Sequence, residues 1–437
     1  MSELKKYQVG DKLIINCSDI SYEGLGVSRL NNYAIFTSNL FPDEQAQVTL
    51  SKVTSKYAFA TVDKLIKVSP YRNKNQYDCY NSAPLINLNY QQQIEFKNNY
   101  FKTLLSWNLG NEILQVYKDF SPSLVITNYR NKVRYPLIKQ DHKLVLGEYD
   151  IKSNDLHIAN NYIQNMHIIN QCLDEVLAIV NNYLESNKKK NAINFYNEII
   201  IRANQDNKVS LAMDIHSDYD IPNSIIESIK DIEYIVDFNI IKKHKVKNIF
   251  TKEEFVMQIA NKEFICNINS FFQININVAQ NIFKQIKEYI SKSFENIILD
   301  AYCGVGTIGQ LVASDHKVIG SDIVQSAIIN ANRNKEINQV QASYFVGDSA
   351  TIFKKQIKDL TNTFLILDPP RSGITPQFIH WIKQNKIKNI IYMSCDVKTL
   401  VRDLKELNDL YEIKSIQGFD MFPNTAHIEA LSILKIK

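Results

Sequence analysis

The feature that most constrains the fold is a pattern repeated along the last third of the chain: a short apolar run, a polar or glycine-rich turn, and a stretch with helical spacing. The run 296–303 leads directly into Gly304-Val305-Gly306-Thr307-Ile308-Gly309, after which a helix is expected. Similar apolar runs lie at 318–322, 344–348, 364–367 and 389–393. This alternation is typical of a parallel sheet covered by helices, whose ligands bind beyond the carboxyl ends of its strands. We therefore expect a doubly wound α/β domain here.

Length and composition set broader limits. A chain of 437 residues is too long for one ordinary core, so two or three domains are expected. A formal net charge of +4 permits an anionic partner without requiring one. The sequence begins without an apolar signal segment and contains no uncharged run of about 18 residues, the length that spans a bilayer. We expect a cytoplasmic protein with no membrane association, and a monomer.

Two regions precede the doubly wound domain. Residues 1–68 contain short alternating runs and a glycine-containing turn, a spacing that predicts a small five-stranded closed barrel. Barrels of the oligonucleotide-binding type bind nucleic acid, although a β module that serves only for packing would show the same pattern. Residues 69–267 predict a mixed α+β domain, with helices at 90–105 and 165–185. Its strands are expected at 144–149, 198–202, 209–215, 234–239 and 264–267.

The middle region also carries two basic clusters, at 129–134 and 242–247. Such clusters are either solvated faces or, where aromatic residues are interleaved, surfaces that contact phosphates and bases. Both interpretations remain open.

The glycine loop fits G-x-G-x-x-G, and Asp322 follows about 20 residues later. This pattern alone suits NAD or S-adenosylmethionine equally well, because both ligands present ribose hydroxyls. The turn Asp368-Pro369-Pro370-Arg371 separates the two possibilities. Its prolines fix a rigid extended turn at the end of an apolar strand. Such a turn is commoner in methyltransferases than in dehydrogenases, so it favours a methyltransferase over an NAD enzyme and over a simple strand-ending turn.

A candidate nucleophile lies at the end of the next strand. The run 389–393 stops at Ser394-Cys395-Asp396, which places a thiol at a polar strand terminus. Cys303, beside the glycine loop, is expected to be a small buried hydrophobe. The six cysteines form no C-x-x-C pair, so neither a zinc site nor a disulfide framework is expected.

Five motifs in the last third together resemble those of the RNA 5-methyluridine methyltransferase family. They are Phe271-Phe272-Gln273-Ile274-Asn275, Asp300-Ala301-Tyr302-Cys303-Gly304, Asp368-Pro369-Pro370-Arg371, Ser394-Cys395-Asp396 with 399–403, and 420–429. Residues 1–68 also resemble the TRAM barrel of the ribosomal-RNA members, and 129–132 is similar to their central segment. The resemblance implies three domains: a TRAM-like barrel (1–68), an RNA-binding α+β domain (69–267) and a Rossmann-like methyltransferase domain (268–437).

The resemblance also implies roles for individual residues. Cys395 would be the nucleophile and Glu429 the base, although without the resemblance the sequence favours a solvated acid at Glu429. Gln273, Tyr302, Asp322 and Asp368 would surround S-adenosylmethionine, with Asp348 as a weaker candidate. Arg402 and Asp403 are expected to hold the Cys395 loop.

One departure concerns an iron–sulfur cluster, which many ribosomal-RNA members hold with four cysteines. Here the corresponding stretch keeps only Cys79, and the fourth position falls near Tyr162. Because one thiolate cannot hold a cluster, we expect none.

The sequence therefore predicts an S-adenosylmethionine-dependent enzyme that methylates carbon 5 of uridine in RNA. The TRAM-like barrel favours 23S ribosomal RNA, and a transfer-RNA substrate stays open. An amino-group nucleic-acid methyltransferase is the alternative enzyme, although it usually has an aromatic residue where Arg371 stands. A non-catalytic RNA-binding protein with the same fold is the third possibility.

Overall fold

The computed structural model describes residues 7–74, 77, 81–149, 155–159, 162–187, 190–360 and 362–437. The chain divides into two compact units. Unit 1 comprises Met1–Thr103 and Phe422–Ile428, and unit 2 comprises Leu104–Met421 and Glu429–Lys437. No helix in the described part of the chain has the length and apolar content needed to cross a bilayer.

Unit 1 begins with a closed five-stranded barrel in the order β1-β2-β3-β5-β4. The strands are β1 (Lys12–Ile20), β2 (Gly26–Leu30), β3 (Tyr33–Thr37), β4 (Gln45–Val53) and β5 (Tyr57–Lys67). Alternate residues point inward and form its core, among them Ile15, Ile35 and Val48. This confirms the expected barrel.

A second part of unit 1 joins segments that are far apart in the sequence. Helix α1 (Tyr90–Leu109) starts here, and Leu85, Leu88 and Ala426 pack together in one buried cluster. The Leu85 N–H donates to the carbonyl of Asn424 (3.0 Å), and the buried Lys97 ammonium donates to the carbonyl of Phe422 (3.1 Å). The segment 422–428 is therefore an integral part of unit 1.

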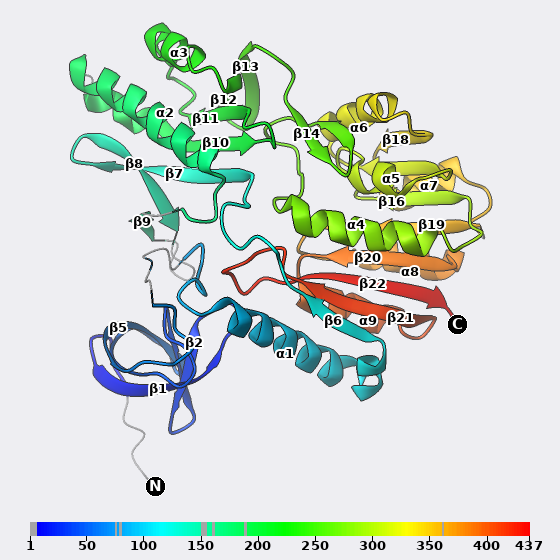
Figure 1. Ribbon diagram of the computed structural model, residues 1–437, viewed down its shortest axis with the longest axis horizontal. Coiled ribbons are helices and arrows are strands. Elements are labelled where there is room, and N and C mark those ends of the chain that lie inside the picture. Colours follow the sequence, from blue (N-terminus) through cyan, green and yellow to red (C-terminus); the bar gives the residue numbers. More distant parts are fainter. Residues whose placement is uncertain are drawn as a thin grey trace. The chain divides into compact units, whose positions relative to one another are not determined.

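Unit 2 contains a seven-stranded sheet in the order β13-β12-β11-β10-β7-β8-β9 (Figure 1). The strands are β7 (Lys132–Gln140), β8 (Lys143–Tyr149), β9 (Leu156–Ile158), β10 (Tyr196–Ala203), β11 (Val209–Ile215), β12 (Ile235–Lys242) and β13 (Lys245–Thr251). Helix α2 (His167–Ser186) buries its apolar face, including Val176 and Val180, in a core shared with this sheet. The 3₁₀ helix η2 (Lys190–Phe195), helix α3 (Asn223–Lys230) and the hairpin β14 (Val256–Ile259) with β15 (Lys262–Ile265) complete the region.

The two basic clusters lie on this sheet. The first cluster, 129–134, runs into the beginning of β7. There Lys132 is partly buried and Arg134 forms an ion pair with Glu198. The second one spans the β12–β13 turn, where Lys242 forms an ion pair with Asp220 (2.7 Å). Part of the positive charge in each cluster is therefore matched within the protein.

The second sheet of unit 2 has eight strands in the order β18-β17-β16-β19-β20-β22-β21-β6 (Figure 1). The strands are β6 (Tyr117–Ser121), β16 (Ile297–Ala301), β17 (Lys317–Asp322), β18 (Ala342–Val346), β19 (Thr363–Leu367), β20 (Asn389–Ser394), β21 (Tyr411–Phe419) and β22 (Glu429–Ile436). The helices associated with this sheet are α4 (Ile276–Ile290), α5 (Thr307–Val312), α6 (Gln325–Ile337), α7 (Ser349–Gln356), α8 (Pro376–Asn385) and α9 (Val397–Leu407), and the 3₁₀ helix η1 (Asn111–Gln115) precedes β6.

The first five strands in this order are parallel, as expected, but the sheet is not parallel throughout. Strand β22 runs antiparallel to both β20 and β21. The edge strand β6 pairs with β21 although it comes from residues 117–121, far ahead of the other strands of this sheet. These two features were not anticipated from the sequence.

Candidate active site

The strand order brings the candidate residues to one edge of the eight-stranded sheet. Asp322 is the last residue of β17, and Tyr302, Asp368 and Cys395 lie just beyond β16, β19 and β20. These four strands are parallel neighbours, so their carboxyl ends meet at the same edge. Because β22 runs the opposite way, its first residue, Glu429, also lies at this edge. Ala430 pairs with Ser394, which places Glu429 beside the strand end that leads into Cys395.

The glycine loop between β16 and α5 is held by two carboxylates. The Gly304 N–H donates to Asp322 Oδ2 (3.0 Å), and the Gly309 N–H donates to the buried Asp300 Oδ2 (3.0 Å). Gly306 adopts φ 80°, which only glycine tolerates easily. A β-carbon at Gly309 would lie 2.6 Å from Asp300 Oδ2 and 2.8 Å from a methyl of Val318. The loop therefore requires both glycines.

Asp322 forms a second hydrogen bond, accepting from the Val324 N–H (2.9 Å). Its carboxylate thus supports the loop and also stays partly exposed at the strand end. Asp348, the weaker candidate, caps α7 by accepting from the Thr351 N–H (3.0 Å). Tyr302 adopts φ 61°, and burial, with smaller contributions from Asp348 and Asp403, raises its pKa to about 12.

The turn after β19 is fastened by Asp403, a fully buried residue of α9. Its Oδ2 accepts from the Ile374 N–H (2.9 Å) and from the Tyr392 hydroxyl (2.7 Å). Arg402 binds Asp403 Oδ1 and also donates to the Ser372 carbonyl (2.8 Å). These two residues therefore hold the segment that follows Asp368-Pro369-Pro370-Arg371, and not the Cys395 loop as expected.

Cys395 is positioned by its neighbours in the β20–α9 turn. Asp396 caps α9 by accepting from the N–H groups of Lys398 and Thr399 (both 3.0 Å). The thiol itself is partly exposed. Burial, with smaller contributions from Glu429 and Asp368 and against an opposing one from Arg371, raises the pKa of Cys395 to about 12. A positive charge near the sulfur is needed to favour the thiolate.

Glu429 is a buried acid with only 2% of its surface exposed, so it is not the solvated residue that the sequence also allowed. Burial raises the pKa of Glu429 well above its usual value, Asp368 adds to this and Arg371 opposes it. Its Oε1 has no hydrogen-bond partner among the described residues. A carboxylate with a raised pKa is a stronger base than an ordinary glutamate.

Asp368 and Asp300 make this edge of the sheet acidic. Burial, followed by the charge of Asp300, raises the pKa of Asp368 to about 8. Burial likewise raises the pKa of Asp300 to about 7, against the Gly309 N–H, which lowers it. The amide of Gln273, in the segment before α4, donates to Asp368 Oδ2 (3.5 Å). A cationic ligand would favour the ionised form of both acids.

Within the described ranges, no group of three or more His, Cys, Asp or Glu side chains is arranged to hold a metal ion. Cys79, on which the expectation about an iron–sulfur cluster rests, lies outside the described residues. Cys303 is buried beside the glycine loop, where its thiol faces the Gly304 carbonyl (3.8 Å).

Sequence reasoning missed two contributors to this edge. Asp300 appeared in the sequence only as part of a motif. It fixes the glycine loop because the chain turns back and brings the Gly309 N–H, nine residues later, to its carboxylate. The spacing of the residues does not show this turn. Arg371 is an exposed residue whose charge acts on both Cys395 and Glu429. The Asp-Pro-Pro-Arg motif was the signal for it, but the motif does not show which groups the guanidinium faces.

The sheet, its glycine loop and the Asp-Pro-Pro turn define the class of the protein as a methyltransferase with a doubly wound sheet. A family model described as tRNA (uracil-5-)-methyltransferase matches residues 89–437. The chain belongs to this family, which confirms the expected enzyme class.

Relatives that match over nearly the whole chain are also named as RNA methyltransferases. An "uncharacterized RNA methyltransferase" of Lactobacillus johnsonii is 29% identical, and the match covers 99% of each chain. A relative of the same description from Fusobacterium nucleatum is 27% identical over 99% of this chain and 97% of its own. Among solved structures, the tRNA (uracil-54, C5)-methyltransferase of Pyrococcus abyssi, in complex with S-adenosyl-L-homocysteine, shares the fold. Its TM-score is 0.74 at 23% identity, and the match covers 97% of this chain and 100% of the other.

Proposed function

We propose that the protein methylates carbon 5 of a uridine in RNA through a temporary bond between Cys395 and carbon 6 of the base. The observation that carries this proposal is the pairing of β20 with β22, which sets Cys395 and Glu429 side by side at one edge of the sheet. Carbon 5 of uracil is a poor nucleophile, so a thiol next to a buried base suits this reaction better than direct transfer.

The first step is addition of the Cys395 thiolate to carbon 6. The new S–C bond pushes the electrons of the 5,6 double bond toward carbon 5 and the neighbouring carbonyl oxygen. Carbon 5 can then form a bond to an electrophilic methyl group. Arg371 supports this step because its charge lowers the pKa of the thiol.

The second step restores the aromatic base. Glu429 removes the proton from carbon 5, the electrons of that C–H bond re-form the double bond, and the Cys395 sulfur leaves carbon 6 as a thiolate. The raised pKa of Glu429 suits it to accept this proton.

S-adenosylmethionine would supply the methyl group from its sulfonium: the S–CH3 bond would break with its electron pair going to sulfur, and S-adenosylhomocysteine would leave. The residues at the edge fit this ligand: the glycine loop allows close approach, and Asp300 Oδ1 is buried without a hydrogen-bond partner in the described part of the chain. Gln273, Tyr302, Asp322 and Asp368 would hold it, with Asp322 on the ribose hydroxyls. The two acids with raised pKa values would favour a cation over a neutral ligand.

We also propose how the chain is divided in function. The barrel within residues 1–68 is a TRAM-like module that binds RNA, and the region 69–267 contacts RNA as well. Residues 268–437 carry the methyl transfer. The TRAM-like barrel supports 23S ribosomal RNA as the substrate.

A transfer-RNA substrate is supported by a different observation. The Pyrococcus enzyme, named as a tRNA methyltransferase, matches 97% of this chain, so a barrel-bearing fold of this kind also occurs in an enzyme that acts on tRNA. Transfer of tritiated methyl groups to 23S ribosomal RNA and to total tRNA from a strain lacking the gene decides between the two substrates. Mapping of 5-methyluridine in the labelled RNA then gives the position.

The covalent route makes different predictions for the two residues. Cys395→Ala should abolish methyl transfer, because no bond to carbon 6 can form. Glu429→Ala should accumulate an RNA–protein adduct that survives denaturing electrophoresis, because the carbon-5 proton is not removed. Cys172→Ala, which removes a buried thiol in α2, serves as the control and should keep activity. Full activity of Cys395→Ala would exclude the route.

A further inference from the structure

A cavity of about 490 Å³ lies in unit 2, apart from the residues assigned to methyl transfer. Met166 and four segments surround it: 125–131, the β10–β11 turn at 203–205, the β14–β15 hairpin at 257–263, and the start of α4 at 275–280. Its size falls in the range of about 300–1,000 Å³ that is usual for small-ligand sites. None of the six predicted site residues lines it.

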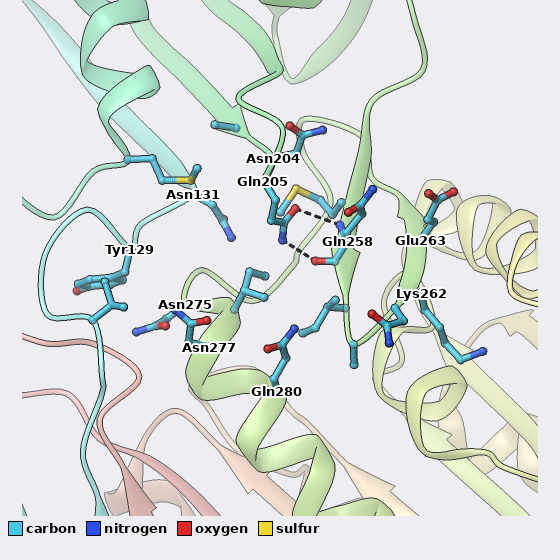
Figure 2. A pocket seen from close by; sticks show the side chains of 18 of the residues that line it. Tyr129, Asn131, Asn204, Gln205, Gln258, Lys262, Glu263, Asn275, Asn277 and Gln280 are labelled. Carbon is cyan, nitrogen blue, oxygen red and sulfur yellow. Dashed lines mark hydrogen bonds between the residues drawn. The ribbon is translucent and has the colours of Figure 1, made fainter.

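The wall of this cavity consists largely of side-chain amides. Nine of its nineteen lining residues are Asn or Gln, and the two charged ones are Lys262 and Glu263. Figure 2 shows Gln280 on α4 across from Gln205 and Gln258, with Asn275 and Asn277 at the start of the helix. An amide offers a hydrogen-bond donor and an acceptor side by side, as the edge of a nucleobase does. The wall therefore suits a neutral, planar heterocycle better than a phosphate.

Some of the amides hold the wall in place. Gln205 Oε1 accepts from the Gln258 N–H (3.2 Å), and its Nε2 donates to the Gln258 carbonyl (Figure 2). Asn204 Oδ1 accepts from the Lys208 N–H (2.9 Å), and its Nδ2 donates to the Val256 carbonyl (2.9 Å). The turn and the hairpin are thus tied to each other, which gives the cavity a fixed shape.

One amide of the wall, Asn131, indicates that the cavity binds a ligand. It is only 2% exposed and lines the cavity, yet its Oδ1 has no hydrogen-bond partner among the described residues. A buried carbonyl oxygen without a partner costs free energy. This oxygen belongs to a residue of the cavity wall but is itself covered, so the side chain would have to shift toward the cavity to accept from the amino or imino group of a base.

Asn131 also connects the cavity with the candidate active site. Its Nδ2 donates to the Gln273 carbonyl (2.8 Å), and the Gln273 side chain reaches Asp368 (3.5 Å). Asn275 and Ile276, which follow two and three residues after Gln273, line the cavity. A ligand held here would therefore contact the segment that positions Gln273.

We propose that this cavity binds a second, unpaired nucleobase of the same RNA that presents its uridine to Cys395. The inference rests on the proposed function, because that function supplies the RNA. Sequence-specific recognition of RNA commonly uses bases turned out of single-stranded loops and bound at their edges. The neutral amide wall accepts the base while the phosphates stay outside.

The test uses the full chain with S-adenosylhomocysteine in excess, so that the donor site cannot accept the probe. AMP, GMP, CMP and UMP are added singly, and saturation-transfer NMR measures their binding. We expect the base protons of at least one nucleotide to receive saturation. Gln280→Ala should weaken this binding by about fivefold or more, as expected for loss of a paired edge contact. Gln285→Ala, on the same helix but not lining the cavity, should leave it within twofold.

A second measurement places the base within RNA. Each nucleotide of a short RNA that contains the mapped uridine is replaced in turn by an abasic residue, and binding is followed by fluorescence anisotropy. One position besides the uridine should weaken binding in the wild type but not in Gln280→Ala. The proposal is overturned if no nucleotide binds, if Gln280→Ala binds as the wild type does, or if no such second position exists. The nucleotide-binding measurement does not depend on methyl transfer or on the mapped uridine, so failure of the proposed activity would be seen separately from failure of the cavity to bind a base.

Discussion

At the scale of single residues, Arg371 is the positive charge that acts on the Cys395–Glu429 pair. Burial and the acids Asp368 and Asp396 raise the pKa of Cys395, and Arg371 lowers it. Arg371 also lowers the pKa of Glu429. The proposed mechanism needs Cys395 and Glu429 in their deprotonated forms. The Arg371 guanidinium favours both forms, so it supports both steps.

This arrangement predicts a pH profile. Because both pKa values are raised, the rate of methyl transfer should increase as the pH rises from 6.5 to 9.5. Arg371→Met removes the charge that lowers these values, so its profile should move to higher pH. Its rate at pH 7.5 should fall by roughly threefold to tenfold, since an exposed charge is partly screened. Single-turnover rates across this pH range check the prediction.

Arg371→Lys is the matched control, because it keeps a positive charge at this position and should follow the wild-type profile. A profile for Arg371→Met that keeps its midpoint but loses amplitude would contradict an electrostatic role. It would indicate instead that Arg371 contacts the substrate.

At the scale of elements, the parallel strands could be predicted because each one is a compact apolar run with an acid or a turn at its end. Strand β6 gave no such signal: only Phe120 is buried in Tyr117–Ser121, and its partner β21 lies about 300 residues further on. Strand β7 was hidden because its first residues, Lys132 and Arg134, look like part of an exposed basic cluster. Long-range pairing decided both strands, and local pattern does not encode it.

The candidate site shows the same division. Cys395, Asp368 and Asp322 stand at the ends of strands, so their common edge followed from strand order. Glu429 came from the resemblance alone, because its place depends on the antiparallel direction of β22. The Nδ2 of Asn131 contacts the Gln273 carbonyl, 142 residues away in the sequence, so local pattern does not announce the position of this side chain.

The segment 422–428 offers a test at this scale. Gln93, which is 1% exposed, donates from Nε2 to Asn424 Oδ1 (3.0 Å) and accepts at Oε1 from the Asn424 N–H (2.9 Å). Gln93→Ala should lower the free energy of unfolding by about 2–4 kcal/mol, because it leaves buried groups unsatisfied. Hydrogen exchange in 422–428 should become faster, and the rate of methyl transfer should fall because Glu429 follows directly.

Gln92→Ala removes a neighbouring side-chain amide. Its Nε2 donates a hydrogen bond to the exposed Glu95 (2.9 Å) and to no other side chain in the described part of the protein. It should change the free energy of unfolding by less than about 0.5 kcal/mol. Equal effects of the two substitutions would show that the bonds to Asn424 do not hold the segment.

At the scale of the whole molecule, the barrel is proposed to add affinity for RNA without taking part in chemistry. Phe36, Tyr57 and Phe59 form an aromatic cluster on β3 and β5, with ring centroids 5.6–5.9 Å apart. Tyr57 is 37% exposed and could stack on a base. Tyr57→Ala should raise the Kd for RNA by about fivefold to tenfold, measured by anisotropy, while calorimetry finds the Kd for S-adenosylmethionine unchanged.

Ile14→Ala is the control on the same barrel, because Ile14 is 58% exposed on β1 but has no aromatic ring. It should leave the Kd for RNA within twofold. A similar loss for both variants would point to a general disturbance of the barrel.

The assignment of Phe422–Ile428 to the same unit as Met1–Thr103 bears on how such enzymes can be recombined. The N-terminal portion cannot be exchanged as one uninterrupted cassette, since residues 104–421, about seven tenths of the sequence, separate it from its last seven residues. A chimera that receives a foreign barrel must also receive the matching stretch before Glu429, and one made without it should be the less active of the two.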